Sequence, residues 1–300
     1  MEPGELFRFD GELPDLGSPV LIHALDGFID AGSARRLARE HLLASGSPQR
    51  VATFDADLLY DYRARRPPML FVEDHWESYD GPDLVLQSLT DATGTPYLLL
   101  SGPEPDVYWE RFVEAMRLIA ERLNVRLTIG LNAIPMAVPH TRSVGVIAHG
   151  SRRELVTGFD PWIATVQVPG SASHVMEYRF GQAGNDAVGF AVHVPHYLSQ
   201  MDYPAAAEVL LQSVSRVSGL VLPTAELATA AAETRRLVDE QIEGNADVAA
   251  VVRSLEEQYD AFVASRGDLL VGDATRLPTA DELGAELERF LAQQQRGPSD

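Results

Sequence analysis

Short apolar runs alternate with segments of helical periodicity along most of the chain, and this alternation restricts the possible folds more than any other feature of the sequence. Residues 20–25 form one such run, a turn and a helical pattern follow up to about Ala44, and residues 51–54 are predicted as the next strand. Residues 97–100 are continuously apolar, which is typical of a strand buried on both faces. A strand–helix–strand order of this kind predicts a parallel sheet covered by helices.

The same alternation continues through the first 222 residues. An amphipathic helix is predicted at residues 107–123, because Phe112, Met116 and Ile119 fall on one stripe. Further helices are expected at residues 81–92 and 203–217, and further strands at residues 126–131, 143–149, 163–168 and 187–194. These elements predict an α/β protein with a three-layer α/β/α sandwich and a mostly parallel or mixed sheet.

The composition changes at Pro223, and from there to the end the pattern is helical. We therefore divide the chain into an α/β/α core, residues 1–222, and a C-terminal α-helical extension, residues 223–300. Helices in the extension are predicted at residues 224–244, 246–265 and 281–295.

Neither a membrane span nor a secretory signal is expected. No apolar run approaches the roughly 20 residues that cross a bilayer, and the first ten residues are acidic where a secretory signal begins with basic residues. The 44 acidic residues outnumber the 24 basic ones, which gives a formal net charge of −20 and disfavours nucleic acid and anionic membranes as partners. We therefore expect a cytoplasmic protein that binds neither nucleic acid nor membrane.

The chain contains neither cysteine nor lysine. Disulfides, thiolate metal sites, Schiff bases and attached pyridoxal phosphate are thereby excluded. The eight histidines show no zinc-site spacing, and no serine lies in a GxSxG elbow. We predict no catalytic residue set, no metal and no cofactor, and we expect the Asp74, His75 and Trp76 cluster to pack rather than to react.

The loop after the first predicted strand is a candidate ligand-binding loop. In open α/β sheets, ligands bind at the carboxyl ends of the strands, where helix N-termini offer free N–H groups. Asp30, Gly32 and Ser33 lie at such a position; Gly32 permits close backbone approach, and Ser33 offers a hydroxyl. The alternative is a tight turn in which Ser33 caps the following helix.

Two later loops supply the other candidate ligand-binding residues. Ser101 and Gly102 follow the run at residues 97–100, and His140 and Arg142 lie between two predicted strands. A histidine and an arginine on one loop could bind an anion or move a proton. The alternative is a turn in which both side chains satisfy backbone carbonyl groups.

A hairpin-like excursion is predicted near residues 58–73, where two apolar runs flank an arginine-rich turn. Asp61, Arg63, Arg65 and Arg66 lie on it. These residues could form an oligomer contact or clamp a ligand through arginine. The alternative is a cluster of solvated or intersubunit salt bridges.

Four short motifs occur in a fixed order: GFIDAG at residues 27–32, DYRARRP at residues 61–67, SGPEP at residues 101–105 and PHTR at residues 139–142. Together they make the chain resemble the proteasome assembly chaperone 2 family, in its actinobacterial branch. The resemblance covers residues 20–222, and the helical tail resembles that branch's C-terminal extension. It implies a core similar to purine nucleoside phosphorylases, a homo-oligomer with a trimer favoured, and C-terminal helices that cover the ligand-binding end of the sheet as a lid.

The resemblance also bears on function. Eukaryotic relatives help to assemble the proteasome α-ring, and archaeal relatives dock on proteasomes through a C-terminal hydrophobic-Tyr-X tail. The sequence ends in Gly297, Pro298, Ser299 and Asp300, so docking by that route is not expected. The family supplies no agreed catalytic residues.

Two hypotheses follow. The first is a non-enzymatic assembly or interaction protein whose partners are further copies of itself and another protein. The second is a protein, or a cryptic phosphorylase- or hydrolase-like enzyme, that binds a small polar ligand at the carboxyl ends of the strands under the helical lid.

Overall fold

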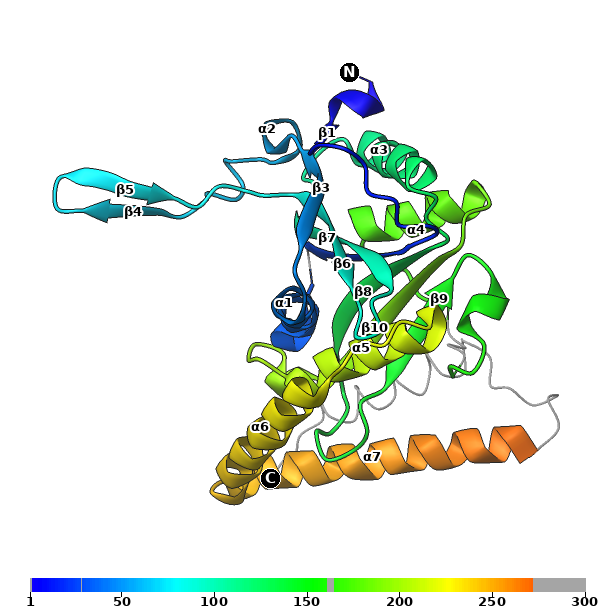
Figure 1. The fold of residues 1–300 in the computed structure, drawn as a ribbon. Coiled ribbons are helices and arrows are strands. Elements are labelled where there is room, and N and C mark those ends of the chain that lie inside the picture. The colour runs from blue at the N-terminus through cyan, green and yellow to red at the C-terminus, as the bar shows by residue number, and fades with distance from the viewer. Residues whose placement is uncertain (1, 28, 161–164, 272–300) are drawn as a thin grey trace.

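The computed structural model describes residues 2–27, 29–160 and 165–271, and it shows a three-layer α/β/α sandwich with C-terminal helices (Figure 1). The strands are β1 (Phe7–Phe9), β2 (Val20–Asp26), β3 (Gln49–Phe54), β4 (Met69–Val72), β5 (His75–Tyr79), β6 (Val85–Thr90), β7 (Pro96–Pro103), β8 (Leu127–Met136), β9 (Val146–Gly150) and β10 (Ala187–Pro195). The helices are α1 (Ala34–Ser45), α2 (Ala56–Leu59), α3 (Trp109–Arg122), α4 (Ala172–Gln182), α5 (Pro204–Ser218), α6 (Ala225–Glu243) and α7 (Ala246–Val271). The predicted fold class is confirmed.

The main sheet has the strand order β1-β3-β6-β7-β2-β8-β10-β9. Its central strands, β7, β2, β8 and β10, are parallel, and every other pairing in it is antiparallel. Because parallel strands end at the same edge, the segments that follow β2, β7, β8 and β10 meet at one edge of the sheet. We call this edge the carboxyl rim.

The central strands are buried on both faces, as the continuous apolar runs predict. In β2, Val20 and Ile22 face the core under α1 and α5, whereas Leu21 faces the core under α3 and α4. The predicted stripe on α3, which includes Phe112 and Met116, is fully buried. Each such side chain stabilises the fold by about 1.5–3 kcal/mol, which fixes the layers and so the position of the rim.

The helix predicted at residues 81–92 is wrong, because half of this segment forms strand β6 and none of it is helical. Val85 and Leu86 are buried, and β6 pairs antiparallel with both β3 and β7. The first predicted strand–helix–strand unit corresponds to β2, α1 and β3. Its two strands are not neighbours in the sheet, because β6 and β7 lie between them. Pairing with distant strands decides the structure here, and local periodicity does not reveal it.

The strand predicted at residues 163–168 is wrong over its described part. Residues 163 and 164 lie outside the described residues, and residues 165–168 have no regular secondary structure. Val166 and Val168 are 59% and 63% exposed, so no neighbouring layer covers them. The edge position beside β10 is taken by β9.

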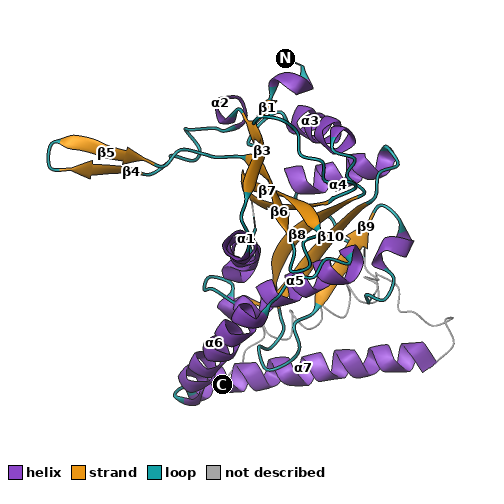
Figure 2. Ribbon diagram, in the orientation of Figure 1, coloured by secondary structure: helices purple, strands orange, loops and turns teal. Residues whose placement is uncertain are grey.

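Strands β4 and β5 form a hairpin that projects from the body of the molecule (Figures 1 and 2). The predicted excursion is therefore misplaced in part, because residues 56–59 form α2 and the paired strands extend to Tyr79. Trp76 contacts Phe71 at 5.0 Å between ring centroids but remains 62% exposed, so the expected packing of the cluster at residues 74–76 is confined to the hairpin itself.

The C-terminal helices follow α5. Helix α6 buries Leu227 and Val238 against the core under α1 and α5, and α7 turns back across the end of the molecule (Figure 1). The helices predicted at residues 224–244 and 246–265 correspond to α6 and α7, and the one at residues 281–295 lies outside the described residues. Within the described ranges, no helix combines the length and apolarity needed to cross a membrane.

Candidate functional site

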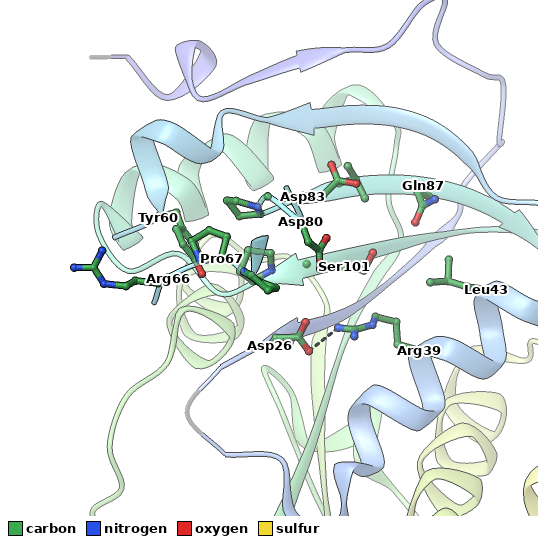
Figure 3. A pocket seen from close by; sticks show the side chains of 16 residues that line it. Asp26, Arg39, Leu43, Tyr60, Arg66, Pro67, Asp80, Asp83, Gln87 and Ser101 are labelled. Carbon is green, nitrogen blue, oxygen red and sulfur yellow. Dashed lines mark hydrogen bonds and ion pairs between the residues drawn. The ribbon is translucent and has the colours of Figure 1, made fainter. Parts of the chain in front are cut away.

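An open pocket of about 490 Å³ lies at the carboxyl rim, where β2 and β7 end (Figure 3). The ends of these strands, β6, helix α1 and both segments that lead into the hairpin line it. The topology explains this position, because β2 and β7 are adjacent parallel strands and the hairpin is inserted between β3 and β6 on the same side of the sheet. The pocket therefore collects residues that are far apart in the sequence.

Charged side chains of both signs line the pocket. The Arg39 Nη1 atom lies 2.6 Å from Asp26 Oδ1 and also donates to the Ala24 carbonyl. Asp83, which also lines the pocket, forms a two-point ion pair with Arg50 outside the lining, with 3.1 Å between Nη1 and Oδ1. A small polar ligand that carries both donors and acceptors would fit such a lining better than an apolar one.

Ser101 and Gly102 lie in this pocket, at the end of β7. Ser101, labelled in Figure 3, is buried. Gly102 has a φ of 121°, and a Cβ at this position would lie 2.8 Å from Leu84 Cα and even closer to the Asp83 carbonyl oxygen. Glycine is therefore required for β7 to pass this close to the segment before β6.

Asp30, Gly32 and Ser33 do not line the pocket. The Asp30 carboxylate accepts hydrogen bonds from the backbone N–H groups of Arg35 (2.8 Å) and Arg36 (3.0 Å), so Asp30 supplies the helix capping that was expected of Ser33. The Gly32 N–H donates to the Ser199 carbonyl at 2.8 Å. These contacts fit the tight-turn interpretation of the loop, and ligand binding by its residues stays a prediction.

His140 and Arg142 contact the C-terminal helices. His140 bridges the Tyr197 hydroxyl (2.6 Å from Nδ1) and Asp239 of α6 (2.9 Å from Nε2), and it is almost fully buried. Burial raises the pKa of Tyr197, which keeps this hydroxyl protonated. Arg142 forms a two-point ion pair with Asp260 of α7, at 2.8 and 2.7 Å. The loop after β8 thus contacts both α6 and α7, in addition to the packing of α6 on the core.

The predicted ligand-binding residues therefore occupy three places along the rim. Ser101 and Gly102 share the pocket, the residues from Asp30 to Ser33 fasten the start of α1, and His140 and Arg142 hold the C-terminal helices. A single cleft shared by all of them stays a prediction.

The charged residues of the arginine-rich segment, residues 61–66, also lie in different surroundings. Asp61 caps its own turn by accepting from the Arg63 N–H at 2.9 Å, and Arg65 pairs with Asp106 at 2.8 Å. Arg66 lines the pocket, and Arg63 is exposed at the base of the hairpin. An oligomer contact through these residues stays a prediction, and Arg63 and Arg66 are the two whose position suits it.

Four charged residues of the pocket were not among the residues predicted from the sequence: Asp26, Arg39, Asp80 and Asp83. Asp26 directly follows the first apolar run, and this position could have predicted that it lies at the carboxyl rim. Asp83 was hidden by the wrongly predicted helix. No histidine lines the pocket, and in the described part of the chain no group of three or more acidic or histidine side chains is arranged to hold a metal.

The comparisons with known proteins agree with this fold. A family model described as PAC2 family matches residues 24–242. The structure is similar to that of a Mycobacterium tuberculosis protein of unknown function, with 54% identity, a TM-score of 0.83 and coverage of 88% of this chain and 93% of that one. A proteasome-assembly chaperone homologue from Mycobacterium tuberculosis is 28% identical, with a TM-score of 0.72 and coverage of 78% and 99%. A Pyrococcus furiosus archaeal proteasome activator, PbaB, shares the fold at 15% identity, with a TM-score of 0.56 and coverage of 79% and 98%. The comparison with curated proteins gives no match.

Proposed function

The chain belongs to the PAC2 family, and from this premise we propose that it is a non-enzymatic assembly or interaction protein. The projecting hairpin β4–β5 is the observation that carries the proposal. A two-stranded hairpin alone is at best marginally stable in water, yet this one exposes five large apolar side chains: Met69, Leu70, Phe71, Trp76 and Tyr79. Exposed apolar groups of this size gain stability when another protein surface covers them.

We propose that the hairpin binds a second copy of this chain, in a homo-oligomer that we expect to be a trimer. The formal net charge of −20 makes the surface of each copy acidic. Arg63 and Arg66, exposed at the base of the hairpin, would therefore face an attractive surface on the neighbouring copy, while Phe71 and Trp76 supply the apolar contact.

The test is the molar mass of the full chain in solution, measured by light scattering after size-exclusion chromatography. We expect the wild-type chain to be an oligomer and the double variant Phe71→Gln, Trp76→Gln to be a monomer with unchanged circular dichroism. Leu118→Gln is the control, because Leu118 is an exposed apolar residue on α3. A monomeric wild-type chain, or a double variant with the wild-type mass, would contradict the proposal.

A proteasome subunit is the heterologous partner that we propose, because a relative with 28% identity is described as a proteasome-assembly chaperone homologue. We place this role in the cytoplasm, in line with a chain that contains no cysteine. Co-purification with actinobacterial proteasome α-subunits is the test. Binding by the wild-type chain that is lost in the hairpin double variant would support the role. If the wild-type chain binds neither free α-subunits nor α-subunits assembled into a ring, the role is rejected.

The pocket favours a second candidate function, the binding of a small polar ligand at the carboxyl rim. The Asp26–Arg39 ion pair beside Ser101 and Gly102 offers donors and acceptors in one cavity. A panel of nucleosides and polar metabolites should then include a compound that raises the melting temperature of the wild-type chain but not of Arg39→Gln. No stabilising compound in the panel would count against this candidate.

A further inference from the structure

A second cavity, of about 420 Å³, lies between the edge strand β9 and helix α4, and it shares no lining residue with the pocket at the carboxyl rim. β9 is the last strand of the main sheet, and α4 packs against its neighbour β10. The polar lining includes His149 of β9, Ser151 directly after it, and His174, Glu177 and Gln182 of α4. This face of the sheet therefore has a polar cavity of its own.

His149 and Glu177 form a hydrogen-bonded pair that joins the two walls of this cavity. The His149 Nδ1 atom lies 2.8 Å from Glu177 Oε1. Gly189 of β10 is the sheet partner of His149, and a Cβ at Gly189 would lie 2.6 Å from Glu177 Oε2 and even closer to His149 Cε1. A side chain at Gly189 would displace the pair, so the glycine provides the room that the pair occupies.

The two histidines keep hydrogen-bonding capacity that the described chain does not use. His149 Nε2 and both ring nitrogens of His174 have no hydrogen-bond partner among the described residues, yet none of these nitrogens is a fully buried atom. Burial and His149 lower the pKa of His174, against the opposing effect of Glu177, so its ring is uncharged near pH 7. A neutral imidazole offers one acceptor nitrogen, and the cavity is therefore rich in acceptors.

The charges of the lining favour a cationic ligand. Glu177 is the one acidic residue in the described lining, and that lining contains no arginine. The whole chain carries a formal net charge of −20, which draws cations towards its surface. A ligand with several N–H donors and a positive charge therefore matches this cavity better than an anion does.

Two arginines near the cavity are balanced by acidic residues. Arg35 contributes, after burial and His149, to the lowered pKa of His174, but it does not line the cavity, and Glu104 acts on it as an opposite charge. Arg179 of α4 forms a two-point ion pair with Glu110, at 3.0 and 2.6 Å. Neither arginine therefore supplies an uncompensated positive charge to the cavity.

The spacing of the two imidazoles distinguishes an ammonium group from a metal ion. The ring centroids of His149 and His174 are 6.3 Å apart. Two imidazoles that share a tetrahedral metal ion, with nitrogen–metal bonds of about 2.1 Å, have centroids about 5 Å apart. Two that accept from one ammonium nitrogen, over about 2.9 Å each, have centroids about 6.5 Å apart. The observed spacing is close to the second value.

We propose that this cavity binds a primary ammonium group, with Glu177 supplying the negative charge and His149 and His174 the acceptor nitrogens. An alkylammonium group carries three N–H donors, one for each of these side chains. The chain contains no lysine, so the group comes from a small amine or from a lysine side chain of a different protein. The site is separate from the hairpin and does not depend on the proposed oligomer.

The test is calorimetric titration of the full chain with butylamine, with Nα-acetyl-lysine methylamide and with 1-butanol, at constant ionic strength and pH 8, where alkylamines are protonated. We expect at least one of the two amines to bind, and 1-butanol, which has no charge, not to bind. Tighter binding of the lysine derivative than of butylamine assigns a lysine side chain of another protein. Equal or tighter binding of butylamine assigns a free amine.

Three variants keep the test decisive. Glu177→Gln, which can still accept from His149, should weaken binding about tenfold or more, the effect of losing a hydrogen bond to a charged group. His174→Phe should weaken it about fivefold, the effect of one neutral hydrogen bond, and it decides the matter if Glu177→Gln does not fold. Glu257→Gln removes an exposed carboxylate of α7, with the same change in net charge, and should leave the affinity unchanged.

Three results would overturn the proposal. The first is that neither amine binds the wild-type chain. The second is that 1-butanol binds as tightly as the amines, which would make the contact apolar. The third is an unchanged affinity in Glu177→Gln, or an equal loss in Glu177→Gln and Glu257→Gln, which would assign the binding to the overall charge of the chain.

Discussion

Gly102 is a position at which the backbone excludes every residue but glycine. Its φ of 121° is unfavourable for any side chain, and a Cβ would collide with the Asp83 carbonyl group. We expect Gly102→Ala to lower the free energy of unfolding by about 2–4 kcal/mol, the combined effect of strain and overpacking.

The control is Gly94→Ala. Gly94 also has a positive φ, of 83°, but no atom lies within 4 Å of a Cβ placed there. Only the backbone strain remains, and a loss of about 1 kcal/mol is expected. Urea unfolding measures both variants, and equal losses would contradict the argument from close approach.

His23 links the stability of the fold to pH. Burial, with His174 and Arg35, lowers its pKa in the folded state to about 3, against 6.5 for a free histidine. Below pH 6.5 the unfolded chain therefore binds a proton that the folded chain does not, and stability falls as the pH falls from 6.5 towards 3. At pH 5 this single group should cost about 2 kcal/mol relative to pH 7.

The measurement is urea unfolding of the wild-type chain and of His23→Gln at pH 7 and pH 5. The loss between the two pH values should be about 2 kcal/mol smaller in His23→Gln. His75→Gln, which removes an exposed histidine, should lose as much as the wild-type chain. An unchanged loss in His23→Gln would show that His23 does not titrate as described.

At the scale of elements, the sequence predicts strands correctly where they are apolar throughout, and it predicts helices correctly where they are amphipathic. The run in β2, the run in β7 and the stripe on α3 were found for this reason. β6 was missed because Val85 and Leu89 are spaced by four residues, as on one face of a helix, while its true partners lie on distant strands. Local periodicity contains no information about such pairing.

The attachment of α6 is an element-scale feature that can be tested. His140 joins Tyr197 to Asp239, and its ring is buried. We expect His140→Leu to lower the free energy of unfolding by about 2–3 kcal/mol, because two polar partners lose their hydrogen bonds. Hydrogen exchange should rise most strongly in α6 and α7. Uniform exchange across the sheet and these helices would show that they do not open separately.

At the scale of the whole molecule, acidic residues exceed basic ones, 44 against 24. Their mutual repulsion favours expanded states of the chain. Raising the salt concentration from about 0.01 to about 0.1 M shortens the Debye length from about 30 to about 10 Å, so we expect the melting temperature to rise by about 2–4 °C. Sodium chloride and potassium chloride should act equally in differential scanning calorimetry, and a fall in melting temperature would contradict the expectation.

The whole molecule also explains how much of the pocket was predictable. Ser101 and Gly102 were predicted because they directly follow an apolar strand, and such positions lie at the carboxyl rim in any parallel sheet. Arg39 and Asp80 come from the middle of a helix and from the base of the hairpin. Only the packing of α1 and the direction of the hairpin bring these charges to the rim, and neither is encoded in short-range patterns.

The hairpin leaves and rejoins the body of the molecule at one point, where the Asp80 N–H donates to the Pro68 carbonyl at 3.0 Å. Strands β3 and β6, which precede and follow the hairpin, are paired in the main sheet. A few glycines could therefore replace residues 69–79 without moving either strand. A change in the length or sequence of this hairpin would therefore leave the main sheet, and the carboxyl rim that it forms, in place.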